Sequence, residues 1–392
     1  VTVTSVSLER CVRAMLADKI SGVHVGLWLL IPEHLRLGTW ELLMAWTGIH
    51  DVHAVEPRLA LQLIHESALC INGMRHRKTL RQKGFETLNG LPFVAADSAI
   101  HNLLNRHTVG DALMLQKTLG LIRQSRGHYP GNLVLIDPHR IGTWSKRQMP
   151  PKKAHSTERA TKVMQTFFAI DGISNQPLAF ILGSSTVTVT QATMTLLDQV
   201  ATILPEGALL VGDSEHFTYD LLNSLVRYPH FSVLIPIPRY KHLLKSISSM
   251  RFTPLWAGYA VTEAPYQRPD IGTPLRLVVQ RTGETNQTYE YKPFVTTSTL
   301  PPEHLMSLIY PERWNIEEFF RMECPLGWNR ASTFNLNIRL GKLSMALIAQ
   351  AAIHQLRQKL PQTMRTWAVE SIARRLFSGI DGDIRVNLDT IV

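Results

Sequence analysis

The hydrophobic positions of this 392-residue chain follow two different periods, and the change between them divides the sequence. Through residues 1–126 apolar residues recur at helical spacing, as in SLERCVRAMLADKI (7–20) and AVEPRLALQLIHESALC (54–70). From residue 131 this period gives way to short, continuously apolar runs, the pattern of buried strands. The pattern predicts a mostly helical N-terminal region, residues 1–126, followed by a domain that contains a sheet.

The second region alternates predicted strands with predicted helices. The strands are, in order, GNLVLID (131–137), VMQTFFAID (163–171), PLAFILG (177–183), GALLVGD (207–213) and FSVLIPI (231–237), with helices at 188–204 and 219–228. Three strands followed by strand–helix pairs are typical of a mixed α/β sheet. We expect a five-stranded sheet of ribonuclease H type, in which the first and fourth strands are neighbours.

The segment 246–298 interrupts this order. Within it, PLRLVVQRTGETNQTYEYKPFVTTS alternates like antiparallel strands around a Gly-Glu-Thr-Asn turn, without a helical period. We therefore predict a β-rich insertion at 246–298 that splits the α/β domain into 127–245 and 299–392. The second part should be helical through RRLF and close with an alternating, strand-like DIRVNLDTIV.

The charge of the chain suggests an anionic partner. The formal net charge is +10 and the isoelectric point is about 9.6. Nucleic acid is the first candidate and an acidic membrane surface the second, although a basic protein needs neither. The basic run MRHRKTLRQK (74–83), between two predicted helices, fits either a solvated loop or a DNA contact.

Cysteine usage and hydropathy limit the other classes. The three cysteines, Cys11, Cys70 and Cys324, show no CxxC or paired spacing, which argues against a disulfide framework or a cysteine-ligated zinc. The longest apolar runs are too short to span a bilayer, and the start lacks a secretion-signal pattern. These features favour a cytoplasmic protein without a membrane partner.

Three acids carry the candidate chemistry. Asp137 and Asp213 follow apolar strands, and Glu317 lies on a late predicted helix beyond the insertion. On that helix, Tyr310 and Arg313 are roughly 60° apart and Glu317 falls between them, so the three share one stripe. Each aspartate alone is more often structural, because strand ends meet water, but the combination of order and spacing is more specific.

A sheet of ribonuclease H type would bring these acids together. Asp137 and Asp213 would end neighbouring strands, and the late helix would carry Glu317 over them. Three converging carboxylates repel one another unless a cation lies between them, and Mg²⁺ prefers oxygen ligands. Two such ions about 3.5–4 Å apart can activate a nucleophile and stabilise a leaving oxygen in phosphodiester displacement.

The residues around these acids resemble the DDE transposases of bacterial insertion sequences, in the branch with a Y-x-x-R-x-x-x-E motif and a β-rich insertion. The resemblance runs from about residue 90 to the C-terminus, and its motifs are LIDPHRIGTWSKR, LLVGDSEHFT and YPERWNIE. It implies that Asp137, Asp213 and Glu317 are the catalytic, metal-binding triad for two Mg²⁺ ions, with Mn²⁺ as a possible substitute. Tyr310 and Arg313 would contact DNA phosphate near the transposon end.

The chain departs from the family pattern at two positions. The motif usually continues to a lysine seven residues after the glutamate, where this chain has Cys324. Arg321, one turn past Glu317, is a candidate replacement, or an ordinary surface arginine. Pro311 does not suit a helix interior and should stop or kink the helix near Tyr310 before it restarts.

Further DNA contacts are expected in the basic stretch after the first acid, which contains Lys146, Arg147, Lys152 and Lys153. In DSEHF, Glu215 and His216 should hydrogen-bond near the site or face solvent rather than form a second metal cluster. Trp256 and Tyr259 fit packing within the insertion better than stacking on a base.

The resulting hypothesis is a Mg²⁺-dependent DNA transposase that nicks inverted-repeat ends of double-stranded DNA and transfers the strands to a target. Two ends must be brought together, which implies a homodimer on DNA, in the cytoplasm of a bacterium at the nucleoid. Two alternatives remain open: a transposase-derived DNA-binding protein that no longer cuts, and a nuclease on a ribonuclease H fold. Fold alone does not choose among them.

Overall fold

The computed structural model describes residues 20–21, 23–51, 53–71, 79–153, 159–330 and 333–380, and the backbone of three short segments beyond them. Residues 7–19 of the predicted helix and residues 74–78 of the basic run at 74–83 therefore lie outside the described residues. The chain forms two compact units: residues 1–115 with 322–392, and residues 116–321. Within the described part of the chain, no helix has the length and apolar character needed to cross a membrane.

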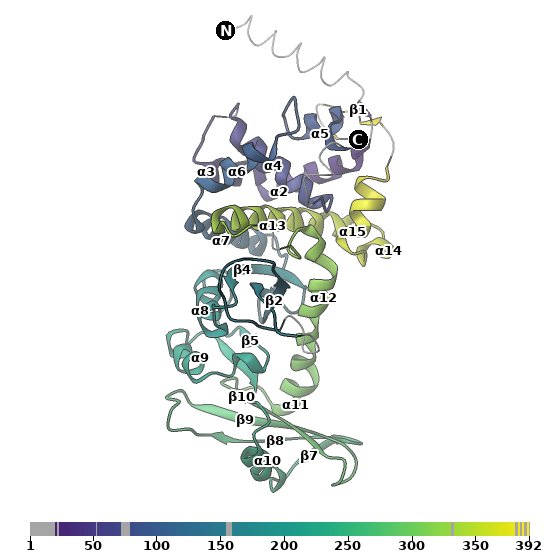
Figure 1. Ribbon diagram of the computed structural model, residues 1–392. Coiled ribbons are helices and arrows are strands. Elements are labelled where there is room, and N and C mark those ends of the chain that lie inside the picture. Colours follow the sequence, from purple (N-terminus) through teal and green to yellow (C-terminus); the bar gives the residue numbers. More distant parts are fainter. Residues whose placement is uncertain are drawn as a thin grey trace, which may run out of the picture. The chain divides into compact units, whose positions relative to one another are not determined.

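The unit 116–321 is built on one mixed sheet of nine strands, in the order β4-β3-β2-β5-β6-β10-β9-β8-β7 (Figure 1). The five strands at one end of this order are β2 (Leu133–Gly142), β3 (Val163–Asp171), β4 (Gln176–Ser184), β5 (Leu209–Val211) and β6 (Ser232–Pro236). β2 pairs antiparallel with β3 and parallel with β5, and β5 pairs parallel with β6. The expected neighbours, the first and fourth strands, are thus adjacent.

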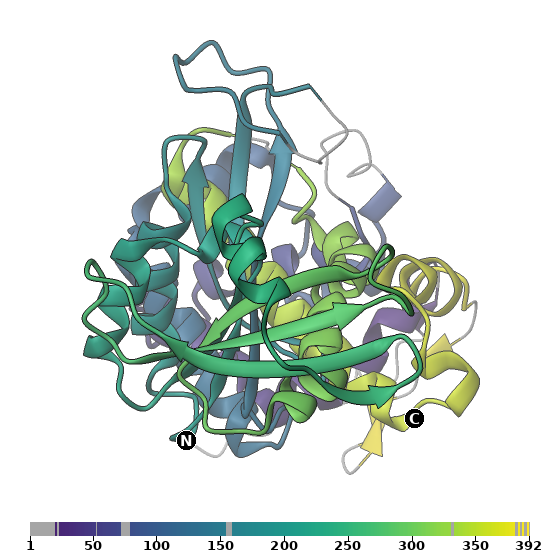
Figure 2. The same ribbon diagram turned by 90° about the horizontal axis from the view of Figure 1, so that it is seen from below.

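The predicted count of five strands was wrong for the sheet as a whole. The insertion contributes β7 (Thr253–Trp256), β8 (Tyr259–Tyr266), β9 (Leu275–Thr282) and β10 (Glu290–Thr296), and β10 pairs with β6. The β-rich character of the insertion was predicted, but its strands extend the main sheet and do not form a separate one. In Figure 2 these green strands lie side by side. An exposed edge at β6 is thereby covered by main-chain hydrogen bonds.

Helices cover both faces of the β2–β6 region. On one face, α8 (Val189–Val200) and α9 (Tyr219–Ser224) pack Leu196, Leu197 and Leu221 into a core that includes Val134 and Ile136 of β2. α8 starts at a capping box in which the Thr188 side chain accepts from the Gln191 backbone and the Gln191 side chain accepts from the Thr188 backbone. The side chains on this face form an apolar core. The polar residues of the candidate site lie on the other face of the sheet.

The opposite face is crossed by the helical run that follows the insertion. It contains α11 (Pro302–His304), a π-helical segment (Leu305–Ile309), a 3-10 turn (Tyr310–Arg313) and α12 (Trp314–Glu323). The changes of helix type surround Pro311, whose ring and missing N–H are incompatible with a regular α-helix interior, so the predicted interruption is confirmed. Phe319 is fully buried, and its ring centroid lies 5.4 Å from that of Phe168 on β3.

The described residues of the other unit, 1–115 with 322–392, are mostly helical, with short strand fragments. Its described helices include α2 (Ile31–Leu37), α3 (Thr39–Thr47), α4 (Val55–Ala68), α5 (Lys83–Leu88) and α6 (Asp97–Arg106), followed by the start of α7 (Val109–Ser125). The 24-residue helix α13 (Leu336–Lys359) packs against α2, α4 and α6. A Cβ on Gly341 of α13 would lie 2.9 Å from Leu104 of α6, so glycine permits this close approach. α14 (Gln362–Arg365) and α15 (Val369–Ile372) follow.

This division differs from the sequence-based domains in one respect. The predicted boundaries join the C-terminal helices to the catalytic domain, whereas their contacts group α13 with the N-terminal helices. No local sequence pattern carries that information, because the partners of α13 lie more than two hundred residues earlier in the chain.

Candidate functional site

The sequence pattern predicted that Asp137 ends its strand. Asp137 instead lies inside β2, because the strand continues to Gly142. Side chains alternate between the faces of a strand, so Asp137 lies on the opposite face from Ile136, which points into the core with α8. Its register partner on β3 is Phe168, which contacts α12. Asp137 is therefore directed to the face of the sheet that α12 crosses.

Asp213 follows β5 by two residues. The parallel register pairs Leu135 with Val211, and the same two-residue step along each strand leads to Asp137 and Asp213 on one face. The Asp213 carboxylate caps the 3-10 turn Ser214–His216 by accepting a hydrogen bond from the Glu215 backbone at 3.0 Å. It also accepts one from Nδ1 of His216 at 2.8 Å.

His216 reaches Asp213 because the residue before the aspartate is glycine. A Cβ at Gly212 would lie 2.8 Å from the His216 ring, closer than packed atoms allow. The His216 side chain is 2% exposed, and no residue that the structure describes hydrogen-bonds to its Nε2. A buried imidazole held in this way keeps its Nδ1 proton directed at the carboxylate. His216 is thus a hydrogen-bonding neighbour of Asp213, the first of the roles expected from sequence.

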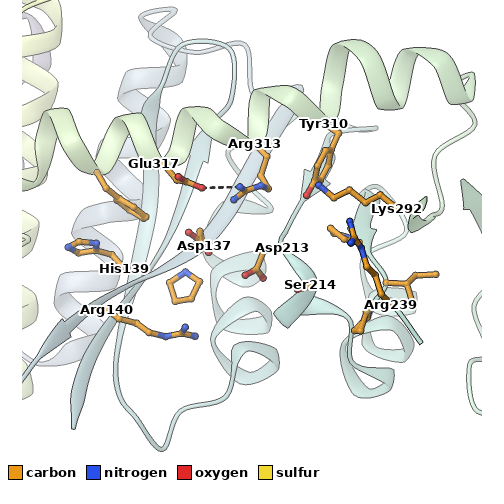
Figure 3. Close-up of a pocket in the computed structure, with 15 residues that line it drawn as sticks. Asp137, His139, Arg140, Asp213, Ser214, Arg239, Lys292, Tyr310, Arg313 and Glu317 are labelled. Atoms are coloured by element: carbon orange, nitrogen blue, oxygen red, sulfur yellow. Dashed lines mark hydrogen bonds and ion pairs between the residues drawn. The ribbon is translucent and has the colours of Figure 1, made fainter. Parts of the chain in front are cut away.

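The helical run supplies Tyr310, Arg313 and Glu317 above the two aspartates (Figure 3). Arg313 donates to Glu317 at 2.9 Å along one helical turn. The Tyr310 ring packs edge-on against Phe294 of β10, with centroids 4.5 Å apart. The predicted stripe therefore exists, and its cation is paired with its acid.

All five of these polar residues line one cavity of about 730 Å³. The cavity extends from His139 and Arg140 of β2, past the aspartates, to Lys292 of β10 and Arg239 in the segment after β6. Figure 3 shows Lys292 and Arg239 beside Tyr310, on the side away from Arg140. Every residue lining the cavity belongs to the unit 116–321.

The two aspartates have opposite pKa shifts. Burial, followed by the charge of Asp213, raises the pKa of Asp137 to about 7. Burial also opposes ionisation of Asp213, but the hydrogen bond from His216 and the neighbouring cations outweigh it and leave the pKa of Asp213 lowered. Two acids that share a site repel each other's charge, so one ionises readily and the other resists.

This donor set fits a hard divalent cation in chemistry, although the third acid is turned elsewhere. Asp137 and Asp213 offer carboxylate oxygens, and a cation would relieve the repulsion that raises the pKa of Asp137. Glu317 is engaged by Arg313. Among the residues that the structure describes, no three or more His, Cys, Asp or Glu side chains gather closely enough to hold a metal ion.

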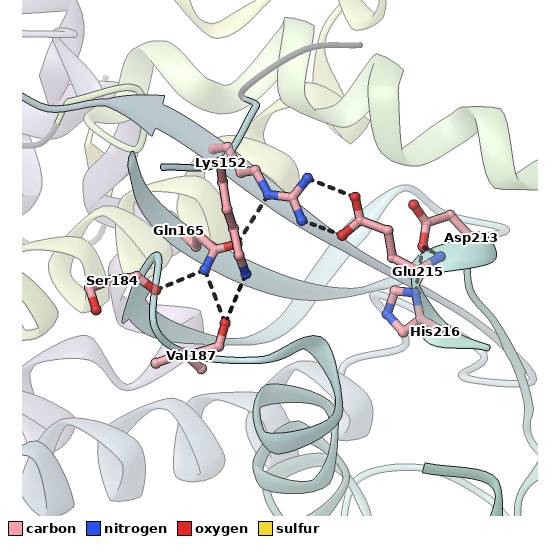
Figure 4. A network of polar contacts seen from close by, with 8 residues as sticks. Lys152, Gln165, Ser184, Val187, Asp213, Glu215 and His216 are labelled. Carbon is pink, nitrogen blue, oxygen red and sulfur yellow. Dashed lines mark hydrogen bonds and ion pairs between the residues drawn. The ribbon is translucent and has the colours of Figure 1, made fainter. Parts of the chain in front are cut away.

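A polar network supports the β2 side of the cavity (Figure 4). Arg140 is only 12% exposed and forms a two-point ion pair with Glu215, two residues after Asp213. Arg140 also donates to Gln165 of β3 at 3.0 Å. The Arg140–Glu215 pair thus ties the turn that carries Asp213 to the strand that carries Asp137. Neither residue's role in this pair was predicted.

Comparison with known proteins identifies the family. The model of a family described as "Transposase DDE domain" matches residues 128–350, more than half of the chain. The chain belongs to the DDE transposase family. The matched residues include Asp137, Asp213, Tyr310, Arg313 and Glu317, and the family predicted from sequence is confirmed.

Solved structures and curated proteins provide two further comparisons. Among solved structures, this chain is similar to the cryo-EM structure of the piggyBac transposase synaptic complex with hairpin DNA. The two chains share 11% sequence identity, with a TM-score of 0.47. That similarity covers 92% of this chain and 82% of the other. No curated protein sequence matched.

The basic residues of the predicted DNA contact differ in their surroundings. Lys146, Arg147 and Lys153 are exposed in the segment between β2 and β3. Lys152 is partly buried, and its ammonium donates to the backbone carbonyl of Val187 at 3.2 Å. In the same segment Trp144 is fully exposed, a feature that the hydrophobic pattern did not reveal.

Neither Arg321, the candidate replacement for the motif lysine, nor Cys324, the residue at the lysine position, lines the cavity. Arg321 forms an ion pair with Glu318 on its own helix and does not line the cavity. Cys324 is buried, and burial raises the pKa of its thiol to about 12. In the insertion, Trp256 and Tyr259 stack on each other with centroids 4.1 Å apart, which fits packing within that module.

The cavity also contains cations that sequence reasoning missed. Lys292 and Arg239 lie far from any motif, and each resembles a solvated basic residue in its local sequence. The pairing of β10 with β6 brings the insertion against the site. A useful sequence signal would have been the alternation of Lys292 with Phe294, which places the two side chains on one face of the strand.

Proposed function

We propose that this protein is a DNA transposase of a bacterial insertion sequence, which cleaves the ends of its element and joins them to target DNA. The observation that carries the proposal is the lining of one cavity by Asp137, Asp213 and Glu317, from three elements distant in sequence. Family membership supports the same activity. The protein would act in the bacterial cytoplasm, at the nucleoid.

The sheet supports a catalytic core of ribonuclease H type. In the region β2–β6 the strand order is third, second, first, fourth, fifth, with the first, fourth and fifth parallel. This is the order that underlies the prediction, and the insertion strands extend it at the fifth strand.

Asp137 and Asp213, with Glu317, are the residues that would hold two Mg²⁺ ions, or Mn²⁺ in their place. When bound, such ions activate the attacking oxygen and stabilise the leaving oxygen of the phosphodiester. Asp213 is kept ionised by His216 and is ready to act as a ligand. Phosphoryl transfer needs little covalent chemistry from the protein, so alignment and charge neutralisation are the main tasks of these side chains.

Arg313 has a second role in this proposal. Its guanidinium now pairs with Glu317 and is 21% exposed, while Glu317 is 40% exposed. A phosphate of DNA is a competing anion with the geometry that a guanidinium prefers. When Arg313 turns to that phosphate, the Glu317 carboxylate becomes available beside the aspartates. Tyr310 and Arg313 would thus contact DNA and at the same time control the third acid.

Double-stranded DNA is the proposed partner, both as transposon end and as target. The net charge of +10 supports binding to a polyanion. Lys146, Arg147 and Lys153, exposed in the segment after Asp137, are proposed backbone contacts. Because two ends react together, we propose a homodimer in the DNA complex.

The test is a cleavage assay on a plasmid that carries the gene with its flanking DNA. Purified protein should nick the plasmid in Mg²⁺ and not in EDTA. Asp137→Asn, Asp213→Asn and Glu317→Gln should each abolish nicking while DNA binding in EDTA persists. Undiminished nicking by Asp213→Asn would overturn the assignment.

One observation favours an alternative, a DNA-binding protein derived from a transposase that no longer cuts. The Arg313–Glu317 ion pair keeps the third acid from the other two. In that case the wild-type protein would bind inverted-repeat DNA but leave it intact in Mg²⁺ and Mn²⁺. A nuclease on the same fold would nick without joining the cut strand to a second duplex, so a strand-transfer assay separates it from a transposase.

A further inference from the structure

One side of the cavity collects positive charge from three separate elements. Arg313 comes from the helical run, Lys292 from β10, and Arg239 from the segment after β6. Two of these cations have an acid nearby: Arg313 pairs with Glu317 at 2.9 Å, and Arg239 with Glu290 at 3.5 Å. Among the described residues, no acid forms an ion pair with Lys292.

Lys292 is held in place by aromatic rings and not by an acid. Its Nζ lies 4.4 Å from the centroid of the Tyr310 ring and 5.6 Å from that of Phe294. Burial, followed by the charges of Arg313 and Arg239, lowers the pKa of this ammonium. A half-buried cation without a counter-ion is costly, and an anion bound beside it would remove that cost.

We propose that Lys292, with Arg239, Arg313 and the Tyr310 hydroxyl, binds one phosphodiester group of the DNA backbone in this cavity. The inference rests on the proposed function, because it takes DNA as the source of the anion. The four groups combine two planar guanidinium forks, one ammonium and one neutral donor, which together suit the several oxygens of a phosphate.

The cations Lys292, Arg239 and Arg313 lie in the same cavity as two acids that would repel a phosphate. The other wall contains Asp137 and Asp213, which repel a phosphate. Cations on the facing wall offset that repulsion and set where the backbone can lie. The insertion, through β10, becomes part of the substrate site.

The test measures binding without cleavage. A fluorescent duplex of about 30 base pairs is titrated with protein in EDTA, over a series of salt concentrations, and anisotropy gives the affinity. Lys292→Met should weaken binding about tenfold at low salt, because hydrogen bonds to charged groups are the strong ones. The slope of log affinity against log salt should fall by about 1, the loss of one phosphate contact. Lys292→Arg should retain most of both.

Lys245→Met is the matched control. Lys245 lies exposed on α10 (Lys241–Ser248), does not line the cavity, and carries the same charge. Thermal unfolding checks that each variant is folded. If Lys292→Met changes affinity and salt slope no more than Lys245→Met does, the proposal is wrong. This outcome does not depend on whether the wild-type protein cuts DNA, so it is separate from a failure of the proposed function.

A second measurement uses the wild-type protein only. Amine acylation followed by mass spectrometry reports the reactivity of each lysine with and without the duplex. Bound DNA should protect Lys292 several-fold while Lys245 stays reactive. Equal labelling of Lys292 in the free and bound states would contradict the proposal. Inorganic phosphate alone at high concentration should give partial protection if the four groups recognise the phosphate itself.

Discussion

Asp137 gives the site a dependence on pH whose sign can be derived. Its pKa in the folded protein is about 7, above the ordinary aspartate value of about 4. Between these two values the folded state binds more protons than the unfolded state, so stability falls as pH rises. A divalent cation bound beside Asp137 would favour its ionised form and offset the repulsion from Asp213, so metal binding and stability are coupled.

We therefore predict that Asp137→Asn stabilises the metal-free protein at high pH. In EDTA near pH 8 the variant should exceed the wild type by on the order of 2–4 kcal/mol, and the two should converge near pH 4. Urea unfolding across this range measures the difference. Added Mn²⁺ should raise the wild-type midpoint and leave that of the variant unchanged. Parallel pH profiles for the two proteins would contradict the prediction.

Gly212 is the residue on which the orientation of Asp213 depends. Gly212→Ala should displace the His216 ring, weaken its hydrogen bond to Asp213, and destabilise the fold by about 1–3 kcal/mol. The variant should also lose most of its thermal shift with Mn²⁺. Gly272→Ala is the control, because a Cβ there meets no atom within 4 Å. Wild-type metal response in Gly212→Ala would show that His216 is dispensable.

At this scale the sequence identified the three acids and the Tyr–Arg–Glu stripe but not their partners. The acids follow from strand and helix patterns that are local. The Arg140–Glu215 pair and Lys292 depend on contacts between residues tens of positions apart, for which a single sequence has no period. A salt bridge between Arg313 and Glu317 was one of two interpretations that the sequence left open, and their i,i+4 spacing favours the pair that the structure shows.

At the scale of elements, the segment between β2 and β3 has basic residues in two different environments. Lys146 and Arg147 are exposed, whereas Lys152 donates to a backbone carbonyl and to Gln165. Basic residues that look alike in the sequence therefore differ in role: some face solvent, and Lys152 holds two parts of the fold together.

We predict that the double variant Lys146→Gln, Arg147→Gln lowers the salt slope of DNA binding by about 1–2 without changing the unfolding midpoint. Lys152→Gln should instead reduce stability, because its partly buried hydrogen bonds are lost. Anisotropy titrations and thermal unfolding distinguish the two effects. An unchanged slope for the double variant would remove this segment from the DNA contact.

Most elements could be predicted, because their signals are short-range. β3 matches its predicted bounds in full, and β4 and β6 match within one residue at either end. The end of β2 was missed because Pro138 interrupts the apolar run, although the strand continues and its residues are paired with β3. Proline removes one hydrogen-bond donor but does not prevent an extended backbone.

At the scale of the whole molecule, each compact unit has its own buried interior. In the helical unit, Arg339 on α13 is 2% exposed, and within the described part of the chain none of its guanidinium nitrogens has a hydrogen-bond partner. Burial lowers the pKa of Arg339 to about 10. In the sheet unit, Phe167 is fully buried in the core between β3 and α8.

We predict two calorimetric transitions that respond to different substitutions. Arg339→Met should raise the melting temperature of one transition, because it removes a buried charge that has no partner among the described residues. The free energy of unfolding of that unit should rise by roughly 1–4 kcal/mol. Phe167→Leu should lower the other by about 1–2 kcal/mol. A single transition that both variants move would show that the units unfold as one.

The discontinuous helical unit has a consequence for synthesis. A ribosome releases the chain from its N-terminus, so the sheet unit has all its residues once position 321 has emerged. The helices α2, α4 and α6 are made before the sheet unit, whereas α13, which packs against all three, is made after it. Until α13 (Leu336–Lys359) has been translated, the surfaces of α2, α4 and α6 that it covers stay exposed to solvent. A premature stop codon between positions 321 and 336 would therefore leave the sheet unit with all its residues and the helical unit without α13.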